Sequence, residues 1–354
     1  MSDPSAAAGE IPKGIDAARV SDWYAANVRG AKLPLTFSII ASGHSNLTYR
    51  VTDAAGDRTV LRRPPLGAVL ATAHDMGREH KILYALAKTD VPVAPVLGLC
   101  TDTAVNGAPF YVMQFVDGFV LDSADAVRAH APEPERMPLG WHVIEVLAKL
   151  HAVDIDAVGL GDLGKREQYL DRQIHRWRTQ WEKSKTRELP AMEEVGDALE
   201  KAKPAQSRTG IVHGDYRIGN MLSKHARIQA VLDWELCALG DPLADIGFLM
   251  NNWAEPGEEN TPTARGAAQS PTVTGGFPTR AQLLARYEEL TGASTANVDY
   301  FRAFQYWRLA AIVEGVMARY LQNVMGKQAD VGAFKAQIDG LAASAQAAVR
   351  RLGA

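Results

Sequence analysis

Cysteine is scarce in this chain of 354 residues, where only Cys100 and Cys237 occur, far apart. Two distant cysteines build neither a disulfide framework nor a cysteine-based zinc site, so a reducing cytoplasm is the simplest compartment to expect. No run of about 18 apolar residues occurs, which argues against a membrane-spanning helix. The first 15 residues lack the basic start and apolar run of a signal peptide, and the N-terminal dozen are expected to form a loose tail.

An excess of charge of either sign is also missing. Lys and Arg total 38 and Asp and Glu total 41, which gives a net charge of −3. This near balance argues against a protein that coats nucleic acid. Hydrophobic residues make up 47% of the chain, so a sizeable core can form. The length suits about two domains.

The N-terminal third of the chain carries strand-like patterns. Three short alternating runs lie within residues 37–63, and two more follow at 95–100 and 109–116. Residues 72–88 change to helical spacing. The pattern predicts a small, mainly antiparallel unit with one long helix.

The rest of the chain is mostly helical. Helical spacing is clearest in residues 139–152, 168–185, 279–291, 298–325 and 330–352. Together the two patterns predict an α+β fold in three parts. These parts are an N-terminal tail with a leading helix at 1–34, a sheet-containing part at 35–116 and a helical part at 117–354.

Residues 254–280 interrupt the helical pattern. This segment is rich in Pro, Gly, Thr and Ala and shows no periodicity. A loop this long in a compact domain is usually a functional lid or disordered, and the sequence leaves both alternatives open.

The stretch "IVHGDYRIGNMLSKHARIQAVLDWE", residues 211–235, is a strand-rich insert in the helical part. Its apolar runs at 221–223 and 228–232 predict a hairpin, although the intervening "KHAR" contains no glycine. Antiparallel pairing would bring Asn220 and Asp233 together at the open end of the hairpin. An amide oxygen beside a carboxylate is a hard oxygen site suited to Mg²⁺.

Asp215 lies five residues before Asn220, in the loop that leads into the hairpin. A carboxylate beside a metal-bound nucleotide can accept a proton from a substrate hydroxyl and orient it for attack. Kinases use this order: a catalytic Asp, an Asn five residues later and then a metal-binding Asp. The pattern therefore predicts Asp215 as the catalytic residue and Asn220 and Asp233 as ligands of Mg²⁺.

The segments "HGDYRIGN", "VLDWE" and "GDPLADIGFL" resemble the aminoglycoside phosphotransferase family of small-molecule kinases. The resemblance extends from about residue 35 over nearly the whole chain, and it implies a two-lobed, protein-kinase-like fold that binds ATP. It also implies that His213 braces the catalytic turn and that the region of Asp245 anchors it. The segment "RQIHRWRTQWEKSKTRELPAM" resembles the branch fused to, or beside, certain acyl-CoA dehydrogenases. Members of that branch are implied to phosphorylate hydroxylated acyl groups, or have no settled substrate.

The segment "SGHSNLTYRV" lies between two predicted strands and resembles the nucleotide loop of this family. A hairpin loop of small polar residues can place backbone N–H groups over phosphates. The residues predicted to bind the nucleotide in this way are Ser42, Gly43, His44, Ser45 and Asn46.

The third predicted strand supplies a cation. In "TVLR", Arg62 matches the position of the strand lysine of kinases. Alternation places Val60 and Arg62 on one face, so that Val60 would contact adenine and Arg62 the phosphates, while Arg63 remains the alternative. Glu79, on the apolar side of the helix at 72–88, is the expected partner of Arg62.

Two further segments complete the predicted site. Met113, Gln114 and Phe115 stand at the expected hinge, where backbone groups would hold adenine. Asp241 is expected to cap the next helix, with Pro242 at the first helical position.

Residues 165–188 contain eight Lys or Arg against four acids, a local net charge of +4. A polycationic aminoglycoside should prefer an acidic pocket, so this bias favours an anionic acceptor such as a hydroxyacyl-CoA. A solvated helix face would show the same bias.

The leading hypothesis is an ATP- and Mg²⁺-dependent phosphotransferase that acts on an alcohol of a small molecule, with no nucleic-acid or membrane partner. The alternatives are an aminoglycoside phosphotransferase and a catalytically silent, nucleotide-binding protein of kinase-like fold. A protein kinase is less favoured, because "DWE" stands where kinases have D-F-G.

Overall fold

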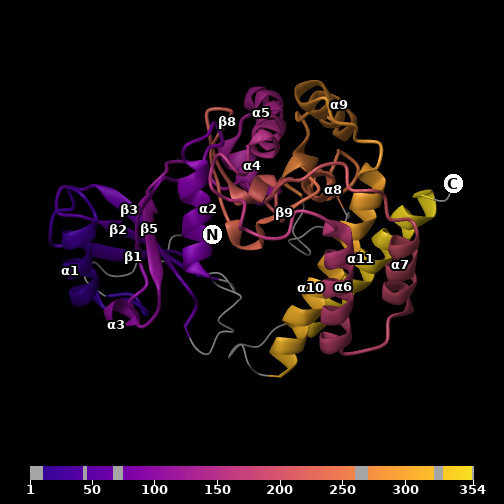
Figure 1. The fold of residues 1–354 in the computed structure, drawn as a ribbon. Coiled ribbons are helices and arrows are strands. Elements are labelled where there is room, and N and C mark those ends of the chain that lie inside the picture. The colour runs from indigo at the N-terminus through magenta and orange to yellow at the C-terminus, as the bar shows by residue number, and fades with distance from the viewer. Residues whose placement is uncertain (1–10, 43–45, 67–74, 260–269, 323–329, 353–354) are drawn as a thin grey trace. The chain divides into compact units, whose positions relative to one another are not determined.

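The computed structural model describes residues 11–42, 46–66, 75–259, 270–322 and 330–352. The chain divides into two compact units, Met1–Asp117 and Gly118–Ala354 (Figure 1). The predicted loop residues Gly43, His44 and Ser45 lie outside the described residues, and so does the centre of the segment at 254–280, residues 260–269.

The N-terminal unit is built on one five-stranded antiparallel sheet with the strand order β1-β2-β3-β5-β4. Its strands are β1 Thr36–Ser42, β2 Leu47–Thr52, β3 Arg58–Arg63, β4 Val96–Cys100 and β5 Phe110–Gln114. All five strand-like runs of the sequence form strands of this sheet, so the predicted antiparallel unit is confirmed. Tyr49, Leu61 and Phe110 place their side chains in the hydrophobic core.

Three helices accompany the sheet, α1 Ala17–Asn27, α2 Met76–Leu86 and α3 Thr103–Asn106. Asp16 caps α1 by accepting the N–H of Arg19, and the helix buries Val20 and Tyr24 in the core of the sheet. Asp75 caps α2 in the same way. Short polar side chains thus fix where both longer helices begin.

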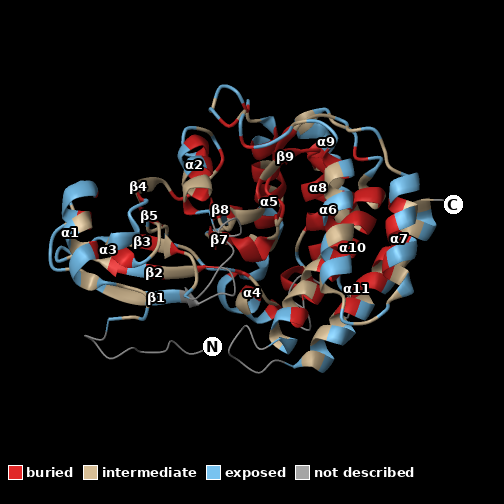
Figure 2. Ribbon diagram, turned by 60° about the horizontal axis from the view of Figure 1, so that its bottom comes forward, coloured by how far each residue is buried: buried red, intermediate tan, exposed pale blue. Residues whose placement is uncertain are grey.

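Helices dominate the C-terminal unit. They are α4 Ala124–His130, α5 Glu133–Ala152, α6 Tyr169–Ser184, α7 Pro190–Lys201, α8 Leu243–Asn252, α9 Arg280–Thr291, α10 Val298–Leu321 and α11 Val331–Leu352. Every residue of α8 is buried, and buried residues also run along α5 and α10 (Figure 2). The five predicted helices are confirmed. α5 begins at Glu133 rather than at 139, because Pro134 fits the first helical turn.

Two short antiparallel sheets lie among these helices. One pairs β6 Gly210–Val212 with β9 Ala238–Gly240, and the other pairs β7 Met221–Lys224 with β8 Arg227–Val231. The 3-10 helices are η1 Ile218–Asn220, η2 Trp234–Leu236 and η3 Pro271–Thr274. The pairing of β7 with β8 confirms the predicted hairpin.

The described flanks of the segment at 254–280 are packed into this unit. Ser270 Oγ donates to the carbonyl of Asn252 at 2.8 Å, and Thr272 Oγ1 donates to the carbonyl of Ala254 at 2.8 Å. Arg280 Nη1 donates to Glu258 Oε2 at 2.8 Å. These bonds hold both flanks against the end of α8.

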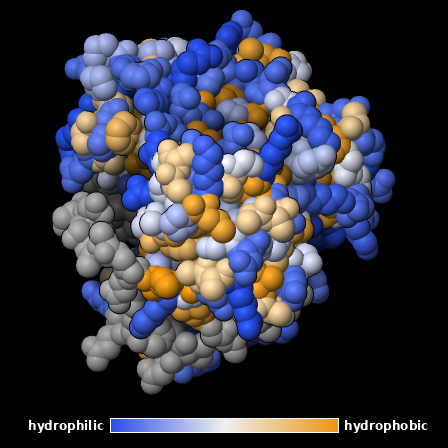
Figure 3. All heavy atoms as spheres, turned by 90° about the vertical axis from the view of Figure 1, so that its left-hand side faces the viewer, coloured by the Kyte–Doolittle hydropathy of each residue, from blue (hydrophilic) through white to orange (hydrophobic). Residues whose placement is uncertain are grey.

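Hydrophilic and hydrophobic side chains are interspersed on the face shown in Figure 3. Ile39 and Ile40 on the edge strand β1 are among the exposed hydrophobic side chains of the N-terminal unit. Within the described ranges, no helix is long and apolar enough to cross a membrane.

Candidate active site

The β7–β8 hairpin closes with a turn that the sequence does not reveal. His225 and Ala226 have φ angles of 51° and 57°. A two-residue type I′ turn requires this left-handed region at both central positions, which usually selects Asn or Gly. Glu135 on α5 supports the turn by accepting the N–H of Ala226 at 3.2 Å. The turn fixes the register in which Met221 faces Val231.

Asn220 and Asp233 flank this register at the open end of the hairpin. The N–H of Leu232 donates to the carbonyl of Asn220 at 2.8 Å, which ties the two strand ends together. Asp233 has a left-handed conformation, with φ 68° and ψ 65°, and turns the chain into η2. Both predicted metal ligands therefore belong to the same end of one small ribbon.

Asn220 also binds the predicted catalytic carboxylate. Its Nδ2 donates to Asp215 Oδ2 at 2.7 Å and to the carbonyl of Asp215 at 3.0 Å. Its Oδ1 accepts no hydrogen bond from any residue that the structure describes. Arg217 Nε lies 3.4 Å from Asp215 Oδ1. Asp215 is thus oriented by an amide and a guanidinium, while Asn220 keeps one oxygen for a cation.

Burial raises the pKa of the Asp215 carboxyl above its ordinary value, and the negative charge of Asp233 raises it further. The charge of Arg217 opposes these effects, as do His213 and the hydrogen bond from Asn220. The influence of Asp233 means that the two carboxyl groups are close enough to repel each other. A divalent cation is the kind of ligand that relieves such repulsion.

A fully buried carboxylate anchors the loop before Asp215. Asp245 on α8 accepts the N–H of His213 at 2.7 Å and the N–H of Gly214 at 2.8 Å. His151 Nε2 on α5 lies 3.3 Å from Asp245 Oδ2. A buried charge requires such donors, so Asp245 is an anchor and not a surface acid.

His213 fastens the same loop to the hairpin. Its Nε2 lies 2.9 Å from the carbonyl of Leu232, and its Nδ1 accepts the N–H of Asp215 at 3.2 Å. On the other side, Arg308 of α10 donates through Nη1 to the carbonyl of Gly214 at 2.9 Å. His213 therefore has the bracing role that the resemblance implies, and Arg308 is a contact that the sequence did not indicate.

The start of α8 differs from the prediction. The helix begins at Leu243, so Pro242 is the N-cap residue and Asp241 precedes the helix. Asp241 still accepts the N–H of Leu243 at 3.0 Å, and it also accepts the N–H of Ser207 at 2.8 Å. The predicted cap position therefore differs by one residue, although Pro242 already has helical dihedral angles, with φ −54° and ψ −27°.

In the N-terminal unit, Glu79 gathers three side chains. Arg62 Nε lies 3.1 Å from Glu79 Oε2, so the expected ion pair is confirmed. Asn46 Nδ2 donates to Oε1 at 3.2 Å, and the Tyr111 hydroxyl donates to Oε2 at 3.0 Å. Tyr111 was not predicted. It reaches Glu79 because it faces Arg62 in the register of β3 with β5, and a single sequence does not give that register.

Arg63 occupies the opposite face of β3. It is 6% exposed, and its Nη1 donates to the carbonyls of Gly14 and Asn106, the latter at 2.9 Å. Arg63 therefore holds the backbone of the N-terminal segment, whereas Arg62 faces Glu79. This arrangement favours Arg62 for a ligand contact.

The predicted adenine contacts are neighbours in the sheet. Val60 of β3 pairs directly with Met113 of β5, and Gln114 pairs with Thr59. Phe115 lies beneath the guanidinium of Arg58, 4.3 Å from its ring centroid. Ser42 ends β1 and pairs with Leu47 of β2, the residue after Asn46.

Four of the eight Lys and Arg side chains of residues 165–188 form ion pairs. The pairs are Arg166–Asp156, Arg178–Asp197, Lys185–Glu182, Lys185–Glu188 and Arg187–Asp339. The anionic acceptor inferred from the net charge of this segment stays a prediction. Arg176 is among the residues of this segment that form no ion pair with a described residue, and its guanidinium carbon lies 5.0 Å from the centroid of the Trp177 ring.

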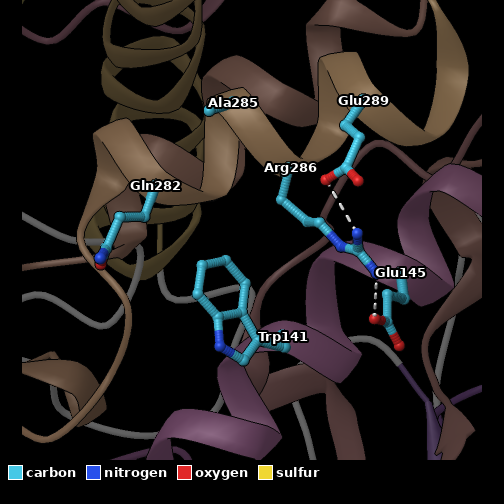
Figure 4. Close-up of a pocket in the computed structure, with 6 residues that line it drawn as sticks. All are labelled: Trp141, Glu145, Gln282, Ala285, Arg286 and Glu289. Carbon is cyan, nitrogen blue, oxygen red and sulfur yellow. Dashed lines mark hydrogen bonds and ion pairs between the residues drawn. The ribbon is translucent and has the colours of Figure 1, made fainter.

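A separate pocket of about 550 Å³ lies between α5 and α9 (Figure 4). Arg286 bridges Glu145 at 3.1 Å and Glu289 at 2.8 Å beside Trp141. The charged side chains of this pocket are paired with one another, and the pocket shares no lining residue with the loop around Asp215.

Residues 36–290 match the family described as "Phosphotransferase enzyme family". Acyl-CoA dehydrogenase family member 10 of Mus musculus is 36% identical over 283 residues, which are 79% of this chain and 26% of the mouse protein. The chain thus spans about a quarter of the length of this relative.

Two solved structures share the fold. A provisionally assigned aminoglycoside phosphotransferase from Ralstonia eutropha JMP134 has a TM-score of 0.79 and 32% identity, covering 95% of this chain and 98% of that one. Aminoglycoside phosphotransferase APH(4)-Ia, in a ternary complex with ADP and hygromycin B, has a TM-score of 0.55 and 17% identity, covering 87% and 94%. The predicted kinase-like fold, a five-stranded antiparallel sheet with a helix followed by a largely helical part, is confirmed.

Proposed function

Since this chain belongs to the phosphotransferase enzyme family, we propose that it transfers the γ-phosphoryl group of ATP to a hydroxyl of an anionic small molecule. One observation carries the proposal. Asn220 binds Asp215 through its amide nitrogen while standing with Asp233 at one end of the β7–β8 hairpin. A carboxylate base and two oxygen ligands in this order suit phosphoryl transfer.

In the proposed reaction, Asp215 orients the acceptor hydroxyl and takes its proton. The acceptor oxygen forms a bond to the γ-phosphorus, the bond from that phosphorus to the β,γ-bridging oxygen breaks, and ADP leaves. Asn220 and Arg217 keep the carboxylate in one orientation. Orientation matters because phosphoryl transfer depends mainly on positioning and charge neutralisation.

Asn220 Oδ1 and the carboxylate of Asp233 are the proposed ligands of Mg²⁺. The fit is chemical, since both are hard oxygen donors and the amide nitrogen of Asn220 is already engaged by Asp215. When bound, Mg²⁺ neutralises the negative charge of the nucleotide phosphates.

The N-terminal unit supplies the proposed nucleotide contacts. Arg62, held by Glu79, pairs with phosphate oxygens, and the strands carrying Val60 and Met113 hold adenine. Gln114, Phe115 and the loop at 42–46 complete this set. The ADP in the structure of APH(4)-Ia supports the assignment through likeness of fold.

Hydroxyacyl-CoA esters and related anionic hydroxy compounds are the proposed acceptors, because the curated relatives include acyl-CoA dehydrogenase family members 10 and 11. The test is ADP formation with short and long hydroxyacyl-CoA esters, and with kanamycin-type sugars alongside. Turnover of the sugars alone would replace the proposed acceptor with an aminoglycoside. No ADP formation with any acceptor would favour a silent nucleotide-binding protein.

Asp233→Ala tests the metal role directly, and we expect it to abolish turnover while the protein stays folded. Asp125→Ala is the matched control, since that carboxylate is an exposed residue of α4 paired with Arg128. Wild-type rates in Asp233→Ala would refute the metal role.

A further inference from the structure

Tyr169, Arg176, Trp177 and Arg308 form a group in the C-terminal unit, called here the Arg308 cluster. The first three belong to α6, and Arg308 belongs to α10, which packs beside α6 (Figure 1). The guanidinium carbons of Arg176 and Arg308 lie 5.0 and 5.4 Å from the centroid of the Trp177 ring. Two cations thus share one aromatic neighbour.

Arg308 is only 5% exposed, yet it uses one nitrogen for all its hydrogen bonds. Nη1 donates to the carbonyl of Gly214 at 2.9 Å and to Gln305 Oε1 at 2.7 Å. Nε and Nη2 have no hydrogen-bond partner among the described residues, and they are not among the enclosed polar atoms. The edge of the guanidinium that can donate two parallel hydrogen bonds therefore has no partner among the described residues and is not fully enclosed.

The charge of Arg308 also lacks a direct counterion. No carboxylate of the described chain lies within ion-pair distance of Arg308 or Arg176. Burial lowers the pKa of Arg308, and the like charge of Arg176 lowers it further. Asp215 and Asp245 act on it from a distance, but both are already bound to Arg217, to Asn220 or to backbone N–H groups. A buried cation in this state is destabilised unless an anion joins it.

Tyr169 adds a neutral donor to the same place. It is 5% exposed, and its hydroxyl has no hydrogen-bond partner among the described residues and is not enclosed. Burial raises its pKa to about 12, so the phenol keeps its proton at neutral pH, although the charge of Arg308 opposes the shift. Its ring lies against Gly240 of β9, where a Cβ atom would come within 2.1 Å of it. Glycine at 240 therefore lets the ring lie beside the β6–β9 sheet that leads into the catalytic loop.

We propose that the Arg308 cluster binds an anionic group of the acceptor, a carboxylate or a phosphate, with Arg308 Nε and Nη2, the Tyr169 hydroxyl and Arg176 as its donors. This inference rests on the proposed function, since it assigns one more part of the substrate to the same site. The planar edge of Arg308 matches the two oxygens of a carboxylate or phosphate.

The position of the cluster limits the acceptor. Arg308 holds the carbonyl of Gly214, the residue before Asp215, so a bound anion lies near the carboxylate that orients the hydroxyl. An acceptor that satisfies both groups carries its acidic group a few bonds from its hydroxyl. Among the anionic acceptors proposed above, a hydroxy acid or a small phosphorylated alcohol has this form. The cluster therefore favours these compounds over a hydroxyacyl-CoA ester, whose phosphates lie far from its acyl chain.

The test uses the intact protein with saturating ADP and titrated inorganic phosphate, followed by thermal unfolding. We expect phosphate to raise the Tm of the wild type, and Arg176→Gln and Tyr169→Phe to weaken the apparent affinity for phosphate by about tenfold and about threefold. Arg178→Gln is the matched control on α6, because Arg178 is paired with Asp197 at 2.8 Å, and it should respond as the wild type. Equal phosphate responses in all four proteins would overturn the proposal.

These two variants carry the test because Arg308 also supports the catalytic loop, and Arg308→Lys could unfold it. The phosphate titration can succeed or fail independently of the proposed kinase activity. A protein that forms no ADP but shows the variant-specific phosphate response would retain the anion site and lose the kinase activity.

With an active acceptor, Arg176→Gln should raise the KM for the acceptor and leave the KM for ATP unchanged. A rise in the KM for ATP alone would assign the cluster to the transferred phosphoryl group and overturn the acceptor role.

Discussion

A group of polar side chains in the N-terminal unit and the loop that carries Asp215 each depend on one buried carboxylate, but these carboxylates bind different parts of the chain. Glu79 binds side chains, the cation of Arg62 and the neutral groups of Asn46 and Tyr111. Asp245 binds backbone N–H groups of two consecutive residues in the loop before Asp215.

The difference shows how two kinds of positioning are achieved. A carboxylate that accepts backbone N–H groups fixes the path of the chain, so every residue of the loop depends on it. A carboxylate that holds a side chain sets only the direction of that side chain. We therefore expect Asp245 to control folding of the loop, and Glu79 to control the contact of Arg62 with a ligand.

The largest effect is expected from Asp245→Ala. Two buried N–H groups and His151 would lose their acceptor, which should lower the free energy of unfolding by about 3–5 kcal/mol and abolish activity. Urea unfolding measures the loss. Asp245→Asn keeps an acceptor and should lose less. A free energy of unfolding within about 0.5 kcal/mol of the wild type would show that Asp245 does not anchor the loop.

Glu79→Gln should have a smaller effect on folding. Glutamine can still accept from Asn46 or Tyr111, so the expected loss is about 2 kcal/mol. Losing the negative charge that orients Arg62 should raise the KM for ATP about tenfold. Calorimetry and initial rates at varied ATP separate the two effects. An unchanged KM for ATP would mean that Glu79 has no part in nucleotide binding.

Arg62→Met and Arg63→Met separate a side chain that contacts a ligand from one that holds the backbone, at adjacent positions of β3. Arg63→Met removes donors from two carbonyls and should cost about 1–2 kcal/mol of stability with little change in the KM for ATP. Arg62→Met should do the reverse, raising the KM for ATP with a smaller loss of stability. The opposite pattern would assign the phosphate contact to Arg63.

The smallest effect concerns the pH dependence of the Asp245 anchor. Burial lowers the pKa of His151, which lies between Asp245 and Tyr287. The unfolded chain binds this proton more readily, so the free energy of unfolding should fall below about pH 6.5, by at most about 1.4 kcal/mol for each pH unit. In His151→Gln this component of the slope should be absent. If the free energy of unfolding changed with pH in the same way in the wild type and in His151→Gln, the predicted role of His151 would be contradicted.

Much of the fold was predictable from periodicity. Alternating runs gave the five strands of the sheet. The apolar face of α2 placed Glu79 where a buried carboxylate needs a cation, and Arg62, chosen from its place in "TVLR", was the expected partner. The apolar runs on either side of "KHAR" gave the β7–β8 hairpin and brought Asn220 and Asp233 to one end. Each of these inferences uses residues close together in sequence.

Contacts between distant segments were not predictable. The basic residues Arg178 and Arg187 are paired with Asp197 and Asp339, which come from other helices, so composition alone overstated the positive charge of the segment. Arg308 follows Gly214 by 94 residues, and no local pattern indicates that it meets the loop. Likewise, the left-handed pair at the hairpin turn contains no glycine to reveal it.

The family match covers residues 36–290, but two helices outside these limits belong to the machinery within them. Tyr24 of α1 bonds to Thr59 at 3.2 Å, and Gln305 of α10 donates to the carbonyl of Ala244 at 2.7 Å. A fragment expressed to the boundaries of the match would lose α1, which packs in the core of the N-terminal unit, and α10, which supports α8 in the C-terminal unit. We expect such a fragment to be recovered as aggregate, so soluble preparations should begin before α1 and continue beyond α10.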